Sequence, residues 1–128
     1  MNGRWLLSIA LAAVAMAMIS SSLEAHHGTS TFDMSRTTTI KGIVVDYQLI
    51  NPHTELTIKV EQDDGAAVEW NVESVSATML LRVGWKRDTV KAGDTVSVTG
   101  HPAKGGKPAM LLVKAVLPDG RELSTAYE

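Results

Sequence analysis

The 128-residue chain contains no cysteine. Disulfide bonds, thiolate metal sites and lipid attachment at a cysteine are therefore excluded, and the fold must depend on its hydrophobic core. Aromatic residues are also scarce, at 5%, with a single phenylalanine. Neither sign of charge dominates, since 12 basic and 14 acidic residues give a formal net charge of −2. A nucleic-acid partner usually requires a basic face, so this balance argues against one.

The N-terminal 25 residues have the three parts of a secretory signal peptide. Arg4 precedes an apolar run over residues 5–19, and a short serine stretch then leads to Ala25. The apolar run is shorter than the roughly 20 residues that a membrane span needs. We therefore predict cleavage after Ala25 and export to the periplasm. An uncleaved anchor is the alternative, and Leu23 at position −3 is compatible with a cut displaced by a residue or two.

The residues after the predicted cut divide into a short arm and one domain. Residues 26–36 are small and polar apart from Phe32, and we expect them to form an N-terminal arm pinned by that side chain. Residues 37–128 contain no internal repeat and no low-complexity tract. This length and composition indicate a single small domain.

Strand patterns dominate this domain. Apolar and polar residues alternate over 56–61 and again over 68–73, and residues 62–66 between them are a hairpin turn signal. We therefore predict that these two strands pair. Residues 37–47 are rich in β-branched residues and contain Gly42, a glycine position typical of a bulge or sharp bend.

Residues 74–83 change to a helical period, with Ser76, Met79, Leu80 and Val83 predicted on one helical face and Gly84 as the C-terminal cap. Further strands follow, and the order β-β-β-α-β-β is that of the OB-fold. We predict a mainly β, OB-fold-like, five-stranded, partly open barrel with one short helix between strands 3 and 4. An open sandwich with a covering helix is the alternative. Two tryptophans are expected in the core, namely Trp70 and Trp85.

The four histidines are the candidate metal ligands: His26, His27, His53 and His101. Cleavage after Ala25 would give His26 a free amine beside its imidazole, a chelate suited to copper(II), and His27 or His53 would complete a three-nitrogen set. The amine must be deprotonated, so affinity should fall below about pH 7. In an OB-fold, His53 and His101 lie in the loops that flank the ligand face. The alternatives are a solvated tail, a loop-structuring His53 and a surface His101.

The other motifs are weaker indications of a functional site. Residues 104–107 lack the spacing of a phosphate-binding loop, and no nucleophile signature occurs in the sequence. Glu69 and Glu73 share a strand face that is expected to be solvated. Three basic residues near the helix are expected to form surface salt bridges rather than an anion site, namely Arg82, Lys86 and Arg87.

The ordered motifs along the chain resemble a family of small exported bacterial proteins, mostly proteobacterial, of unknown function. The resemblance implies export and an OB-like barrel, and it supplies no activity. Two positions depart from the pattern: Leu49 replaces a usual tryptophan, and Ser74–Val75 replaces a Ser-Pro step. The matching positions are Ala25–His27, Phe32, Asp33, Gly42, Asn51–His53, Trp70, Glu73, Leu81, Arg82, Gly84, Trp85, Gly93, Asp94, Val96, Gly100 and Leu117–Gly120.

Taken together, the sequence favours a soluble periplasmic binding protein that is not an enzyme, with copper(II) or a similar ion as the candidate ligand. The first alternative is a metal-free accessory module that binds a protein or a small organic ligand on the barrel face. The second is a mononuclear copper redox enzyme. We expect no nucleic-acid partner and no membrane partner after cleavage, and the sequence specifies no oligomeric state.

Overall fold

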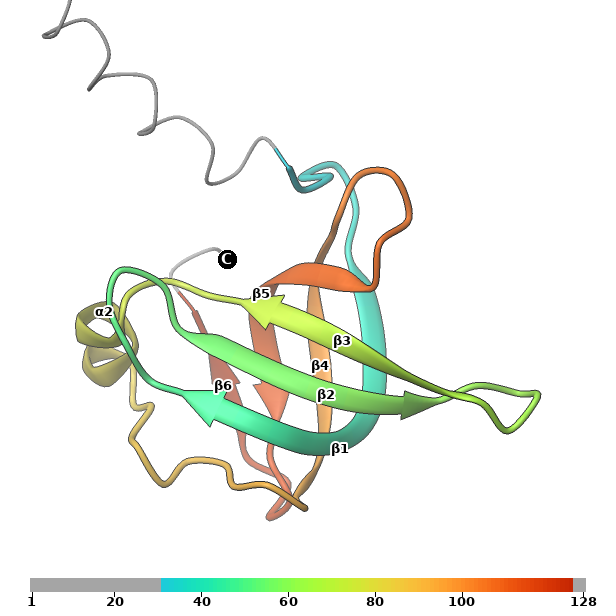
Figure 1. The fold of residues 1–128 in the computed structure, drawn as a ribbon. Coiled ribbons are helices and arrows are strands. Elements are labelled where there is room, and N and C mark those ends of the chain that lie inside the picture. Colours follow the sequence, from blue (N-terminus) through green and yellow to red (C-terminus); the bar gives the residue numbers. More distant parts are fainter. Residues whose placement is uncertain (1–30, 126–128) are drawn as a thin grey trace, which may run out of the picture. The chain divides into compact units, whose positions relative to one another are not determined.

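The computed structural model describes residues 31–125. The predicted signal peptide, His26 and His27 lie outside these residues. Six strands and one short helix follow in chain order (Figure 1). They are β1 (Thr38–Gln48), β2 (Glu55–Glu61), β3 (Ala67–Glu73), α2 (Ala77–Arg82), β4 (Thr95–Pro102), β5 (Ala109–Val116) and β6 (Glu122–Ser124).

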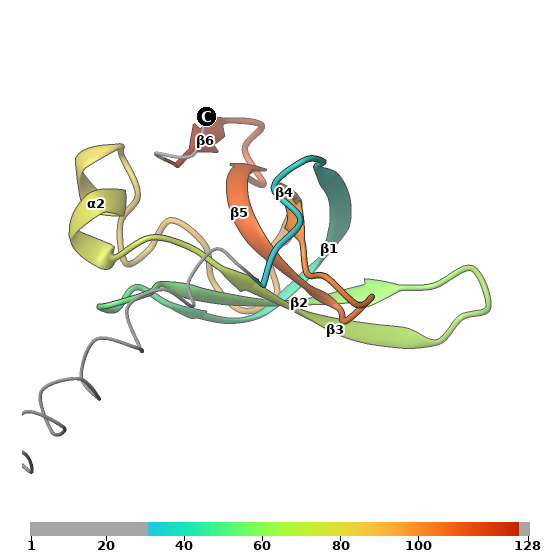
Figure 2. The ribbon, with the colours of Figure 1, turned by 90° about the horizontal axis from the view of Figure 1, so that it is seen from above.

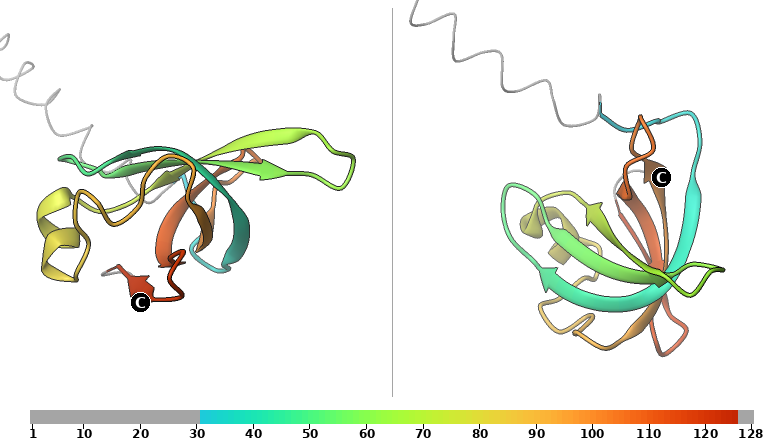
Figure 3. Two further views of the ribbon diagram at one scale, coloured as in Figure 1. Left: turned by 90° about the horizontal axis from the view of Figure 1, so that it is seen from below. Right: turned by 45° about the vertical axis from the view of Figure 1, so that its right-hand side comes forward.

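Five of the strands close into a barrel. β1 pairs antiparallel with both β2 and β4, β2 pairs with β3, and β4 pairs with β5. A short parallel pairing of β3 with β5, over Asn71–Glu73, completes the ring (Figure 3). β6 adds to the other end of β5. A five-stranded barrel with its helix between β3 and β4 confirms the predicted OB-like fold.

β1 belongs to both halves of the barrel because it bends. It pairs with β4 up to Ile43 and with β2 from Ile43 onward, and its register shifts between Val44 and Asp46. A Cβ at Gly42 would overlap the Lys59 carbonyl oxygen, so the close approach of β1 and β2 requires glycine there. β1 therefore has the expected irregularity, but its register shift lies between Val44 and Asp46, just after Gly42.

The core fills the barrel interior and the space under the helix. The predicted hairpin of β2 and β3 is confirmed, with Leu56 opposite Val72 and both buried. Trp85 is also buried, as predicted, whereas Trp70 is only partly buried and packs against the edge of the core. The fully buried side chains are Val44, Ile58, Val72, Leu80, Trp85, Val96, Val98, Met110 and Leu112.

The helix α2 is shorter than predicted and turns a single edge to the core. Ser76 caps its first turn, and Gly84, at φ +99°, follows its end as expected. Only Ala77 and Leu80 are buried in it, while Met79 and Val83 are exposed. Of the four residues predicted on one helical face, only Leu80 is buried, because a helix of six residues presents a single edge to the barrel. No helix within residues 31–125 has the length and apolar character to cross a bilayer.

The described part of the N-terminal arm docks on the end of β4. Phe32 is 5% exposed and forms a bridge with Ala103. The Asp33 amide donates to the Pro102 carbonyl at 2.8 Å, and the Lys104 amide donates to the Thr31 carbonyl at 2.9 Å. The arm is thus held beside the loop that joins β4 to β5.

Candidate functional site

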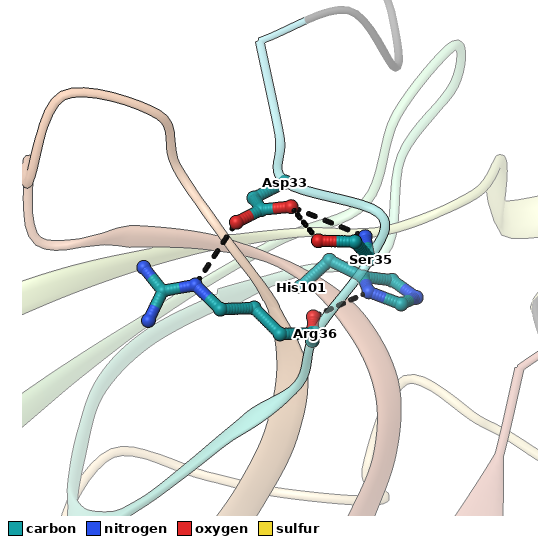
Figure 4. Close-up of polar contacts among 4 residues, drawn as sticks. All are labelled: Asp33, Ser35, Arg36 and His101. Atoms are coloured by element: carbon teal, nitrogen blue, oxygen red, sulfur yellow. Dashed lines mark hydrogen bonds and ion pairs between the residues drawn. The ribbon is translucent and has the colours of Figure 1, made fainter.

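His101 lies near the end of β4 and is held in one orientation by the arm. Its ring Nδ1 is 2.8 Å from the Arg36 carbonyl oxygen (Figure 4). A carbonyl can only accept, so the neutral ring carries its proton on Nδ1 and keeps a lone pair on Nε2. Imidazoles that bind metals are usually oriented in this way, by a carbonyl or carboxylate on the other nitrogen.

A tight turn over residues 33–36 presents the Arg36 carbonyl to His101. The Asp33 carboxylate accepts from the Ser35 hydroxyl at 2.6 Å, the Ser35 amide at 3.1 Å and the Arg36 Nε at 3.0 Å (Figure 4). The Ser35 donors, with Arg36, hold the pKa of the Asp33 carboxyl below its ordinary value of 3.8. The ionised carboxylate therefore closes the turn at neutral pH.

His53 lies in the loop between β1 and β2, as predicted, and is half exposed. Its Nδ1 is 3.3 Å from a Glu73 carboxylate oxygen and 3.4 Å from the Ser74 carbonyl oxygen. The loop is tied to the segment before α2, because the Thr54 amide donates to the Val75 carbonyl at 3.0 Å. His53 thus also has oxygen acceptors at Nδ1.

The strand register places His101 on the same side of the sheet as Glu73, the partner of His53, although Leu111 between them is only 3% exposed. His101 pairs with Leu111, and Leu111 pairs with Glu73, the partner of His53. Directly paired residues project to the same side of a sheet, and the adjacent Pro102, opposite Met110, points to the interior. Neighbouring strands lie about 4.8 Å apart, so the backbones of His101 and Glu73 are about 10 Å apart.

Within residues 31–125, no three histidine, aspartate or glutamate side chains gather closely enough to hold a metal ion. His53 and His101 are therefore separate donors, and neither forms a site by itself. His26 and His27 lie outside the described residues. The sequence did not predict that the Glu73 carboxylate contacts His53 or that the Arg36 carbonyl contacts His101. The strand alternation places Glu73 on the outer face, but no local pattern signals either contact.

A groove lies on the part of the barrel that binds ligands in OB-folds. It has a volume of about 460 Å³ and runs over the outer face of β2 and β3 beside the loop between β4 and β5. Its walls carry two carboxylates, small polar groups and one tryptophan edge. The lining residues are Glu55, Thr57, Glu69, Trp70, Asn71 and Lys107 to Ala109.

The topology and these contacts define a small OB-fold barrel with His101 on the same side of the sheet as Glu73, the partner of His53. The chain belongs to the family of unknown function DUF6152, whose sequence profile matches residues 11–112. No curated protein sequence matches it.

Several solved structures are similar to this chain, among them the following two. The S. cerevisiae mitochondrial single-stranded DNA binding protein Rim1 is 14% identical, with 64% of this chain and 91% of that chain covered and a TM-score of 0.50. A ZRD-deleted mutant of TiaS in complex with agmatine is 17% identical, with 72% of this chain and 24% of that chain covered and a TM-score of 0.47. At this identity, the likeness to Rim1 shows the fold alone.

Proposed function

We propose that this chain is an exported, non-enzymatic small protein that binds copper(II) or a similar ion through its N-terminal histidines and a loop histidine. The observation that carries the proposal is the orientation of the two described imidazoles. His101 has Nδ1 at a carbonyl and His53 has Nδ1 at a carboxylate and a carbonyl, which leaves Nε2 of each as the outward donor. Neutral imidazole nitrogen is a preferred donor for copper(II).

A free amine and an imidazole at His26 would supply two nitrogens of the proposed chelate, and a neutral imidazole on the barrel would supply the third. His101 is the better oriented of the two described candidates because its Nδ1 is 2.8 Å from the Arg36 carbonyl oxygen. His27 and His53 are the remaining candidate donors.

Electron paramagnetic resonance of the copper(II)-loaded protein beginning at His26 tests the ligand set. We expect hyperfine splitting from the nitrogen ligands. In His101→Ala the splitting should show one imidazole fewer, and the copper(II) affinity should weaken by about tenfold or more. His53→Ala tests the remaining candidate donor on the barrel, and we expect it to keep the parent spectrum. If both single variants keep the parent spectrum and affinity, neither His53 nor His101 is a ligand. If the reduced copper protein consumes oxygen faster than free copper does, the chain is a redox enzyme instead.

Export is tested separately from copper. We expect protein recovered from the periplasmic fraction to have the intact mass of residues 26–128. A product that stays in the cytoplasm or retains residues 1–25 would contradict this part of the proposal. A product that begins a few residues away from His26 would remove the amine chelate while leaving export intact.

The groove over β2 and β3 supports a second candidate, a metal-free accessory module that binds a small polar ligand. Its two carboxylates, Glu55 and Glu69, outnumber its one cation, Lys107, and so favour a neutral or cationic ligand over an anion. A ligand-dependent rise in melting temperature that survives a chelator would favour this candidate over the copper protein. A ligand effect abolished by the chelator would favour copper.

Nucleic acid is the ligand named for Rim1, and the same face of this chain is poorly suited to it. Single-stranded DNA binding combines a cationic groove with aromatic side chains on which bases stack. Here the groove carries Glu55 and Glu69, and Trp70, its one aromatic residue, packs partly against the core. We expect no change in the fluorescence anisotropy of a labelled oligonucleotide at low salt. Salt-sensitive binding to it would overturn this expectation.

A further inference from the structure

One end of the barrel exposes an apolar surface around α2. Segments 49–54 and 74–87 form this end, which we call the α2 end, and the Ala77 amide joins them by donating to the Ile50 carbonyl at 3.1 Å. Figures 2 and 3 show α2 at an extremity of the barrel, away from the turn between β2 and β3. Half of the large apolar side chains exposed in residues 31–125 lie here, namely Ile50 (43%), Met79 (43%), Leu81 (54%) and Val83 (45%).

The residues of α2 and its C-cap that face away from the barrel form one uninterrupted arc. Successive residues turn by about 100° around a helix, so its positions can be ordered by angle. The two buried residues, Ala77 and Leu80, lie together on the barrel side. The outward arc then runs through Leu81, Thr78, Arg82, Met79 and Val83. Three apolar side chains therefore flank a single arginine at its centre.

The charge of the α2 end is entirely positive, although the whole chain has a net charge of −2. Its two segments contain Arg82, Lys86 and Arg87 and no acidic residue. Among residues 31–125, none of these three cations forms an ion pair. The predicted surface salt bridges are therefore wrong. Three acidic residues directly border the two segments in the sequence: Glu55 follows Thr54, Glu73 contacts His53, and Asp88 follows Arg87.

We propose that the α2 end docks on an anionic lipid surface. Exposed apolar side chains can enter the boundary between headgroups and acyl chains while arginine and lysine meet the lipid phosphates. The exposed apolar side chains lie among three cations within the same two segments, a combination that suits a surface of lipid phosphates. Lipid attraction accumulates with each basic side chain. This proposal replaces the expectation of no membrane partner, and it is independent of copper binding.

Vesicle co-sedimentation tests the proposal, using the protein in the form in which it accumulates in the cell. We expect it to pellet with vesicles of phosphatidylcholine and phosphatidylglycerol, to be released by salt, and to stay in solution with phosphatidylcholine alone. The triple variant Arg82→Gln, Lys86→Gln, Arg87→Gln should lower the partition coefficient about a hundredfold. The double variant Met79→Gln, Leu81→Gln should lower it at every salt concentration.

Matched controls separate this surface from net charge and from the N-terminal segment. The triple variant Lys41→Gln, Lys59→Gln, Lys107→Gln removes the same charge elsewhere on the barrel and should bind nearly as the parent does. All variants share the parent's N-terminus, and their melting temperatures report whether they fold. Equal losses in the two triple variants, or absence of binding to the anionic vesicles, would overturn the proposal. Concentration-dependent self-association lost only in Met79→Gln, Leu81→Gln would assign the surface to a second copy instead.

Discussion

Trp85 connects the segment after α2 to β6, the last strand of the chain. Its replacement should measurably lower the free energy of unfolding. The residue is 1% exposed, its indole N–H donates to the Ser124 carbonyl at 3.1 Å, and its amide donates to the Leu80 carbonyl at 3.1 Å. The Tyr47 ring lies 6.3 Å from it, between ring centroids. The Trp85 side chain thus links β1 to β6, and its backbone amide ties it to the helix.

The cost of Trp85→Phe can be worked from these contacts. Loss of the indole donor to Ser124 should cost about 1 kcal/mol of the free energy of unfolding. The smaller ring leaves a cavity that costs roughly another 1 kcal/mol, at about 24 cal/mol per Å³. The sum of about 2 kcal/mol should lower the urea midpoint by about 1 M. Trp85→Ala should cost about 3–5 kcal/mol, a large share of the 5–15 kcal/mol typical of a domain.

Urea unfolding followed by far-ultraviolet circular dichroism measures both variants without relying on tryptophan emission. Trp70→Phe is the matched control because Trp70 is only partly buried, and it should cost less than about 1 kcal/mol. If Trp85→Phe lowers the free energy of unfolding no more than Trp70→Phe does, the role given to Trp85 is refuted. An unchanged midpoint in Trp85→Ala would refute the core as described.

Three further predictions follow from individual contacts. Burial raises the pKa of Tyr47 to about 12, so stability should fall as pH rises from about 10 toward 12, and urea unfolding of Tyr47→Phe should lack this fall. Ser35→Ala should raise the pKa of Asp33 toward 3.8, measured by carboxyl NMR titration, so that the 33–36 turn opens at higher pH than in the parent. Gly42→Ala should cost about 1–3 kcal/mol by thermal unfolding, more than Gly65→Ala, whose added Cβ meets open space although its φ is +80°.

Much of the fold could be predicted because its signals are local. Alternation over β2 and β3 fixes which residues face the interior, and Gly42 marks the bend of β1. The helical period alone does not show which side of α2 the barrel covers, because Met79 and Val83 have the spacing of a core stripe and are exposed. In a helix this short, the barrel contacts only Ala77 and Leu80, and apolar side chains remain outside.

The candidate site depends on contacts that no local pattern specifies. His101 and Glu73 reach one face only through the parallel pairing of β3 with β5, which joins distant parts of the chain. The orientation of His101 depends on a backbone carbonyl, that of Arg36, which any residue type would supply. The histidine positions could therefore be predicted, whereas their Nδ1 partners could not.

Copper(II) affinity of the protein beginning at His26 is the most direct test of the proposed function. The comparison is with the same protein carrying one extra residue before His26, which removes the amine from the chelate and keeps every imidazole. Competition titration at neutral pH should show much tighter binding by the protein that begins at His26, and the difference should shrink as pH falls below about 7. Equal affinity of the two proteins would contradict the proposed copper site.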